Sequence, residues 1–172
     1  MDSKSIFSAL SFVSVFIYMY VGIYTYRHNT KSLINRVFLS LCTSYAIWSF
    51  AYAFAYASNN KIAFSFWNKI SALGWCSFSA ITLYLVLLIT DNKLVKNKLI
   101  VVFVFSPAVI FFYMSVFLFG VGINTPTIIS NIFYIGDFLY NFTFLIISII
   151  LIFFWGAKTD SKRIKIQSKI LV

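Results

Sequence analysis

The sequence predicts an all-α polytopic membrane protein, a bundle of about five transmembrane helices with its N-terminus outside and its C-terminus in the cytoplasm. Of its 172 residues, 61% are apolar and only 10% are charged, and the mean hydropathy is +0.90. A water-soluble domain carries roughly 25% charged residues. The second observation is that long apolar runs alternate with short basic connections, which defines both the helices and their orientation.

The first apolar run, Ile6 to Tyr26, is interpreted as a membrane helix rather than as a cleaved secretion signal. It is longer than the roughly 7–15-residue core of a signal peptide, and no A-x-A cleavage site follows it. Ser8, Ser11 and Ser14 give this run a seam of small residues, along which a second helix can approach closely.

The second run, Arg36 to Ala57, contains an alternation of aromatic residues and alanine over residues 50–57. A period of two is typical of a strand. However, alanine is the best helix former, and an open strand in lipid would leave backbone groups unpaired. A helix is therefore predicted, with Trp48, Tyr52 and Tyr56 on one stripe beside a stripe of small residues.

Three further runs reach the roughly 20 residues that cross a bilayer: Ile70–Thr90, Leu99–Phe119 and Phe138–Ala157. The connection between the last two, residues 120–136, is uncharged. This connection could be a lid or a short interfacial helix, and Thr125 as the helix cap with Pro126 at the first helical position favours the helix. Residues 1–157 are thus the predicted transmembrane bundle. Residues 158–172 are a basic cytoplasmic tail with the possible start of an incomplete sixth span.

Lysine and arginine predict the orientation, because cytoplasmic loops carry an excess of them. Eleven lie in the first gap, the third gap and the tail, while the opposite side holds Lys4 and Lys61, with Lys69 at a helix end. These cations lie between apolar runs. The net charge of +10 therefore indicates contact with the bilayer and its anionic headgroups and argues against nucleic-acid binding.

Patterns typical of an enzyme are absent from the sequence. There is no Glu, the single His is His28, and the four Asp are scattered. No phosphate-binding loop or pair of metal ligands occurs. Cys42 and Cys76 lie inside apolar runs, as small buried side chains do. We therefore expect no catalytic residue, no metal site and no cofactor.

Lys69 allows two interpretations. Its long stem can reach the headgroups beside Trp67, which requires no function. Alternatively, it faces the bundle and pairs with Asp137, which opens the last run at the same outer depth, with Asn141 one turn further in. The second interpretation predicts a polar outer cluster of Lys69, Asp137 and Asn141.

Aromatic residues make up 21% of the chain. Interfacial belts and helix packing account for most of them. The alternative is an outward-facing pocket for a lipophilic or aromatic ligand. Its candidate lining residues are Trp48, Tyr52, Tyr56, Trp67 and Trp75.

A longer pattern has a known counterpart. Trp48 in the second run is followed at residues 66–75 by F-W-N-K-I-S-A-L-G-W, then by an apolar run ending in Thr90-Asp91 and by Pro107 in the fourth run. Over residues 6–172 this pattern resembles the N-terminal seven-helix membrane region of bacterial sensor histidine kinases. The resemblance implies a seven-span bundle with signalling domains in the cytoplasm. It also implies that Trp48, Trp67, Gly74 and Pro107 are structural marks of the domain.

The chain stops where a sixth span would begin and carries no dimerisation helix, phosphoacceptor histidine or ATP-binding domain; His28 is followed by Asn29, where the family expects an acidic residue. We therefore expect a truncated sensor or input module of a signal-transduction protein in the bacterial inner membrane, without catalytic output. Its partner would be a cytoplasmic signalling protein or a second copy. The alternative is a small transporter or scaffold subunit. It is disfavoured because Gly74 and Pro107 form no matched pair of helix breaks.

Overall fold

The computed structural model describes residues 3–118 and 127–158, and every regular element in these ranges is helical. The α-helices are α1 (Ser3–His28), α2 (Leu33–Ala57), α3 (Lys61–Trp75), α4 (Phe78–Ile89), α5 (Lys98–Tyr113) and α6 (Thr127–Lys158). A 3-10 helix, Lys93–Lys96, precedes α5, and a π-helical segment, Met114–Leu118, follows it. Five helical segments are long and apolar enough to cross a membrane, which confirms the predicted all-α fold and number of spans.

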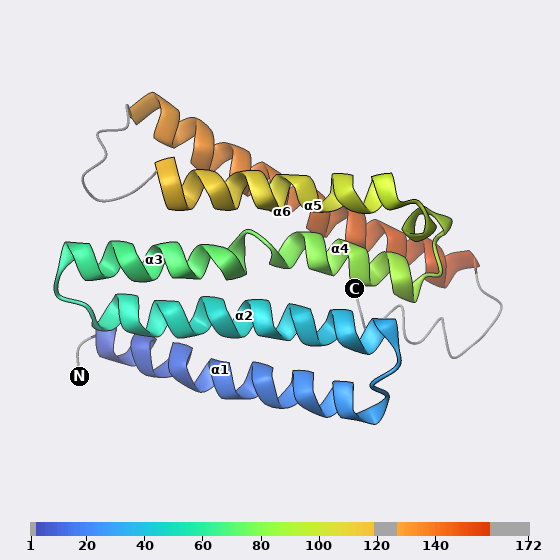
Figure 1. Ribbon diagram of the computed structural model, residues 1–172, viewed down its shortest axis with the longest axis horizontal. Helices are drawn as coiled ribbons and strands as arrows, with labels where there is room; N and C mark the ends of the chain where they lie inside the picture. The colour runs from blue at the N-terminus through green and yellow to red at the C-terminus, as the bar shows by residue number, and fades with distance from the viewer. Residues whose placement is uncertain (1–2, 119–126, 159–172) are drawn as a thin grey trace.

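The helices run back and forth along one long axis (Figure 1). α1, α2 and α3 are antiparallel neighbours, and α4 continues in the direction of α3. α2 contacts α1, α3 and α4, so it is the inner helix of this part. α6 packs mainly against α4 and only slightly against α5.

Two helical segments begin well before the predicted spans. The third begins at Lys61 rather than Ile70, because Asn60 caps α3 by accepting a hydrogen bond from the Ile62 amide (2.9 Å). The last helix begins at Thr127 rather than Phe138, so residues 127–136 are helical but belong to the last span and not to a separate interfacial helix. The helical segments Lys61–Ile89 (29 residues) and Ile128–Lys158 (31 residues) are both longer than the roughly 20 residues that the hydrocarbon requires. Thr125, Pro126 and residues 159–172 of the tail lie outside the described residues.

Several serine and threonine hydroxyl groups form hydrogen bonds within their own helix. Ser14, Thr43 and Thr82 each donate to the carbonyl four residues earlier, at 2.7–2.9 Å. Ser106 donates to the Phe103 carbonyl (3.0 Å), which Pro107 leaves without its amide partner. Throughout the described ranges, no buried side-chain nitrogen or oxygen lacks a partner. This is what a lipid environment demands.

The bundle has two regions with different packing. In the α1–α3 region, the buried residues are small: Ala51, Ala53, Ala55, Ala72 and Gly22. In the α4–α6 region, the core is built on larger side chains, Leu83, Leu87, Val104 and Tyr140, with Ala80 and Ala108 between them. The first region therefore brings backbones together, and the second interleaves side chains.

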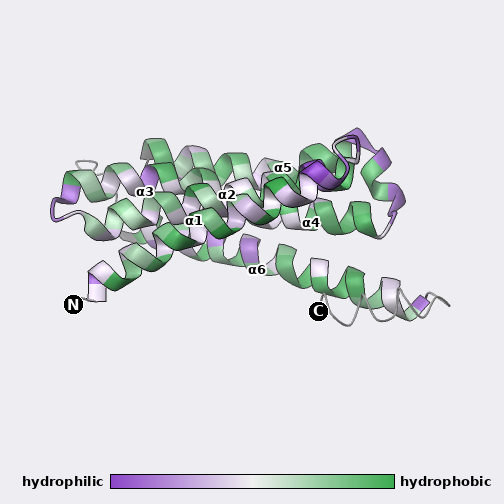
Figure 2. Cartoon of the chain, turned by 90° about the horizontal axis from the view of Figure 1, so that it is seen from below, coloured by the Kyte–Doolittle hydropathy of each residue, from purple (hydrophilic) through white to green (hydrophobic). Residues whose placement is uncertain are grey.

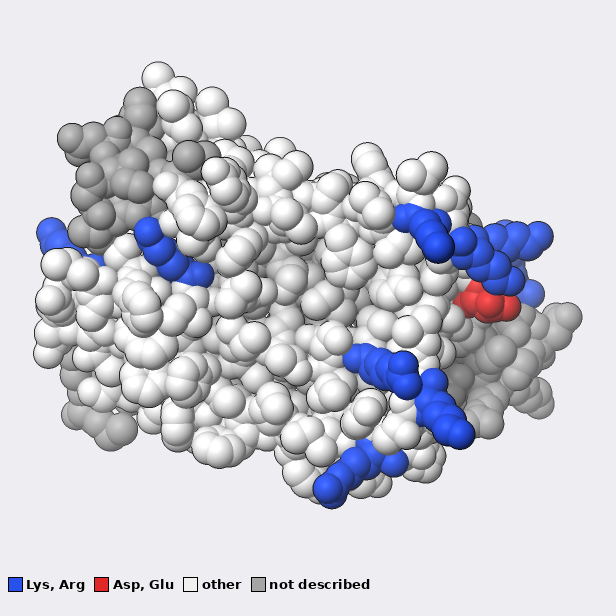
Figure 3. Space-filling model, viewed as in Figure 1, with Lys and Arg blue, Asp and Glu red and all other residues white. Residues whose placement is uncertain are grey.

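The outer surface is apolar along the helices and polar at their connections (Figure 2). Lysine and arginine gather at the end of the bundle that holds the α1–α2 and α4–α5 connections (Figure 3). The residues concerned are Arg27, Lys31, Arg36, Lys93, Lys96 and Lys98. The structure thus places the cations of the first and third gaps on one side.

Candidate functional site

A helix break lies inside the third membrane span. α3 ends at Trp75 and α4 begins at Phe78, yet Lys61–Ile89 together form one segment apolar enough to span the bilayer. The break is near the middle of that segment. Backbone carbonyls released by a break in hydrocarbon must find other partners, because water is absent there.

The backbone at the break tightens but keeps its direction. Cys76 and Ser77 retain near-helical angles, with φ −73° and ψ −26° for Cys76 and φ −98° and ψ −25° for Ser77. The Ser77 amide donates to the Gly74 carbonyl (3.1 Å), three residues earlier, and the Ser77 hydroxyl donates to the Leu73 carbonyl (2.6 Å). α4 therefore continues along α3, with one irregular turn between them.

α2 approaches the break at Gly74. A Cβ atom on Gly74 would lie 2.5 Å from the Ser44 carbonyl oxygen and 2.7 Å from Trp48 Cβ, so only glycine permits this distance. The closeness lets the buried Ser44 hydroxyl donate to the Gly74 carbonyl (2.8 Å). The hydroxyl oxygens of Ser44 and Ser77 lie 2.9 Å apart, so either hydroxyl can donate to the other in place of its carbonyl partner.

α6 contacts the break from another helix through two consecutive residues. Tyr140, which is 8% exposed, donates its hydroxyl to the Cys76 carbonyl (3.1 Å). The Asn141 side-chain oxygen accepts from the buried Ser79 hydroxyl (2.7 Å). The Asn141 amide donates in turn to the Asp137 carbonyl (3.0 Å) and carboxylate (3.1 Å).

We call these groups the break network: Ser44, Ser77, Ser79, Asp137, Tyr140, Asn141 and the carbonyls of Gly74 and Cys76. It joins α2, α3, α4 and α6 through hydrogen bonds in the interior of the bundle. It can register and transmit changes in helix position, because the Ser44, Tyr140 and Ser79 hydrogen bonds each depend on the register of two helices.

The predicted polar outer cluster is present only in part. Asp137 and Asn141 are joined as expected, but among the described residues Lys69 forms no ion pair or hydrogen bond with Asp137. Sequence reasoning missed Ser79 and Tyr140. The signal that was available is the pair Tyr140-Asn141, two polar-tipped residues inside an otherwise apolar run.

The five aromatic candidates do not share one pocket, although Tyr56 contacts Tyr52 (5.5 Å between ring centroids). Trp48 stacks on Phe78 of α4 (5.9 Å between ring centroids, 6° between planes) and meets Tyr52 edge-on (6.0 Å). Trp67 stacks on Phe54 across the α2–α3 contact (4.6 Å), and Trp75 meets Phe133 of α6 (6.4 Å). The structure therefore brings Trp48 and Tyr52 together and assigns Trp67 and Trp75 to separate helix contacts.

Within residues 3–118 and 127–158, no group of three His, Cys, Asp or Glu side chains lies close enough to hold an ion. Cys42 and Cys76 are buried free thiols in the α2 and break regions.

A family model described as the N-terminal 7TM region of histidine kinase matches residues 10–172, which include every residue of the break network. No curated protein and no solved structure matches the chain.

Proposed function

Since the chain belongs to the family of N-terminal 7TM regions of histidine kinases, we propose that it is the membrane-embedded input module of a bacterial signal-transduction protein in the cytoplasmic membrane. Regions of this family are input domains and not catalytic ones. What the chain contributes is therefore a change in helix packing, and the chemistry of the output belongs to a signalling partner.

The break network is the observation that carries this proposal. The Tyr140 hydroxyl and the Asn141 side-chain amide hold α6 to the α3–α4 break. The other neighbour of α6, α5, makes few contacts with it. A small axial shift or rotation of α6 breaks both bonds together. Such a coupled set of bonds gives the bundle two discrete arrangements, which a stimulus can bias by binding one better than the other.

Asp137 supports the same interpretation. Ionisable residues within membrane spans are rare and costly, and they mark functional positions by default. Here the carboxylate accepts a hydrogen bond from Asn141, which in turn accepts one from Ser79. A change at Asp137 is thus passed through one side chain to α4.

The charge distribution supports an orientation with the basic end in the cytoplasm. In that orientation α6 carries the movement inward, since its C-terminal residue Lys158 follows a long apolar helix toward that side. The partner would be a cytoplasmic signalling protein or a second copy of the chain.

The test is a chimera in which residues 1–172 are joined to the dimerisation and catalytic domains of a histidine kinase. Tyr140→Phe removes only the hydroxyl that holds the break. An interhelical hydrogen bond in a membrane averages about 0.6 kcal/mol, so the basal autophosphorylation rate should shift about threefold. Tyr134→Phe, at a ring that is 61% exposed on the same helix, is the matched control and should leave the rate unchanged. Equal rates for wild type and both variants, at equal membrane levels, would contradict the proposal.

The orientation is tested by membrane-impermeant thiol labelling. A cysteine at Lys93, in the α4–α5 connection, should be reactive only from the cytoplasmic side. A cysteine at Asn60, the cap of α3, should be reactive only from outside. The reverse pattern would invert the proposed topology.

A small transporter is the second candidate, because a span broken near its middle is also a feature of transporters. Here the Gly74 and Cys76 carbonyls are occupied by Ser44 and Tyr140 rather than turned to a cavity. The input module is therefore preferred. A positive substrate-uptake assay in vesicles, abolished by Gly74→Leu but retained by Leu10→Phe, would reverse that order.

A further inference from the structure

A groove lies between the start of α1 and the end of α2, at the opposite end of the bundle from the clustered cations. Its volume is about 620 Å³, which is within the range of roughly 300–1,000 Å³ for ligand pockets. The lining residues are Lys4, Ser5, Ser8, Ala9 and Phe12 from α1, and Ala53, Phe54, Tyr56, Ala57 and Asn59 from α2 and the segment after it.

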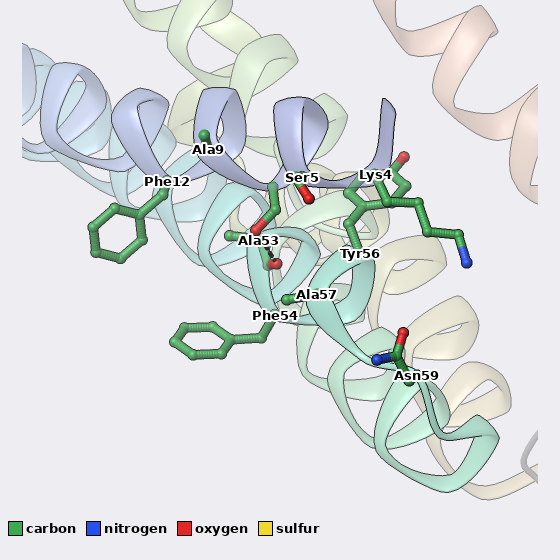
Figure 4. A pocket seen from close by; sticks show the side chains of 10 residues that line it. Lys4, Ser5, Ala9, Phe12, Ala53, Phe54, Tyr56, Ala57 and Asn59 are labelled. Atoms are coloured by element: carbon green, nitrogen blue, oxygen red, sulfur yellow. Dashed lines mark hydrogen bonds between the residues drawn. The ribbon is translucent and has the colours of Figure 1, made fainter. Parts of the chain in front are cut away.

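The groove is polar at one end and apolar at the other (Figure 4). Lys4 and Asn59 lie together at one end, and the rings of Phe12 and Phe54 lie at the other. Along α1, Lys4 and Phe12 are separated by eight residues, a rise of about 12 Å. This is the polarity order of a lipid in one leaflet, with its headgroup at the surface and its chain inside.

The charged and polar groups at the polar end are available to a ligand. Ser8 is not, since its hydroxyl donates to the Ala53 carbonyl (2.7 Å) and thereby fixes α1 against α2. In the part of the chain that the structure describes, no ion pair or hydrogen bond engages the side chain of Lys4, Ser5 or Asn59. The lining includes one cation and no carboxylate, so its charge complements an anion.

The apolar end is accessible from the lipid. Phe12 is 43% exposed and Phe54 is 38% exposed. In the most apolar 18-residue stretch of α1, only 6% of the residues are buried by the rest of the protein. A lipid of the surrounding leaflet therefore reaches the groove by lateral movement, without leaving the bilayer.

We infer that this groove is a binding site for an anionic phospholipid, with its headgroup at Lys4 and Asn59 and one acyl chain between Phe12 and Phe54. The small side chains of Ala9 and Ala57 leave the space that the chain fills. The inference does not depend on the proposed signalling role, because lipid retention is measured without any kinase output.

The test is native mass spectrometry of the purified full chain, loaded with equal amounts of phosphatidylglycerol and phosphatidylcholine of the same acyl length. One lysine near a membrane surface contributes about 1 kcal/mol toward anionic lipid, which corresponds to about a fivefold preference. Wild type should retain phosphatidylglycerol with about that preference. Lys4→Ala should abolish the preference and Lys4→Arg should restore it.

Two matched controls separate the groove from general attraction. Lys61→Ala removes a cation at the same end of the bundle but outside the groove, and should retain the preference. Ala9→Phe fills the groove and should lower retention of both lipids, whereas Leu10→Phe, at a neighbouring side chain that is 59% exposed, should not.

Several outcomes would overturn the inference. Equal losses in Lys4→Ala and Lys61→Ala would show surface attraction without a site. Unchanged retention in Ala9→Phe would place the lipid elsewhere. Displacement of phosphatidylglycerol by added laurate in wild type but not in Ala9→Phe would identify a soluble amphiphile as the ligand. A dimer that becomes monomeric in Ala9→Phe would show that a second copy fills the groove.

Discussion

The α1–α3 region and the α4–α6 region differ in what touches at their helix contacts. In the first, a Cβ added to Gly22 would lie 2.7 Å from Cys42 Cβ, and one added to Gly74 would lie 2.5 Å from the Ser44 carbonyl. In the second, a Cβ added to Gly136 would approach nothing closer than the Phe111 ring, at 3.4 Å. Contacts between backbones have one permitted distance, whereas contacts between long side chains can rearrange. The first region is therefore suited to be a fixed frame, and the second to be the part that moves.

The largest effect is expected at Gly74, where the α1–α3 region has no room for a side chain. Gly74→Ala should lower the free energy of unfolding by about 2 kcal/mol, because overpacking forces α2 and α3 apart. Thermal unfolding in detergent measures this. Gly136→Ala is the matched variant in the α4–α6 region and should be neutral or slightly stabilising, since alanine favours helix more than glycine does. Equal destabilisation by the two variants would remove the distinction between the regions.

The next effect concerns the hydrogen bonds of α6. Asn141→Leu leaves the Ser79 hydroxyl and the Asp137 carboxylate without their shared partner, and should cost about 1.5 kcal/mol of stability. Thr143→Val, an exposed position on the same helix, serves as the control for removing a polar group. Urea or SDS titration of both variants makes the comparison; a loss no larger for Asn141→Leu than for the control would show that the network contributes little.

A smaller effect tests whether the break links the two regions. Ser44→Ala and Tyr140→Phe each remove one interhelical hydrogen bond, at about 0.6 kcal/mol each. The two carbonyls they bind are only two residues apart. If the break acts as a unit, the double variant should depart from the sum of the single effects by about 0.5 kcal/mol. Strict additivity in a double-mutant cycle would indicate two independent contacts.

The smallest effect is expected for a hydrogen bond that lies within a single helix. Ser106→Ala frees the Phe103 carbonyl that Pro107 leaves without an amide partner. The loss should be about 0.5 kcal/mol, because the bond lies within α5. Unfolding of this variant beside Ser44→Ala would show whether a bond within one helix contributes as much as a bond between two.

The sequence predicted the number and order of the spans because apolar length alone determines them. It did not predict the break at Cys76 and Ser77, since the apolar run is continuous there and the hydroxyls that satisfy the break come from Ser44 and Tyr140, far away in the chain. The early start of α3 did have a local signal in the sequence, because Asn60 is a good helix cap. A prediction based on apolar length alone does not use that signal.

The candidate site was anticipated only at Asp137 and Asn141, which are four residues apart on one helix. Their partner on α4 depends on which face of α6 meets α4, and a sequence pattern alone does not determine that. The aromatic candidates illustrate the same difficulty. Trp48 and Tyr52 are four residues apart and touch, whereas Trp67 and Trp75 come from another helix and face different neighbours.

The hydroxyls that bond within their own helix have a consequence for biogenesis. Helices such as α1, with Ser14 bonded to the Leu10 carbonyl and Thr25 to the Val21 carbonyl, present little unmet polarity to the translocon. They can therefore enter the bilayer one at a time as stable units. Ser44 gains its partner when α2 and α3 pack, and the Tyr140 and Asn141 hydrogen bonds form only when α6 docks, so α6 completes the break network.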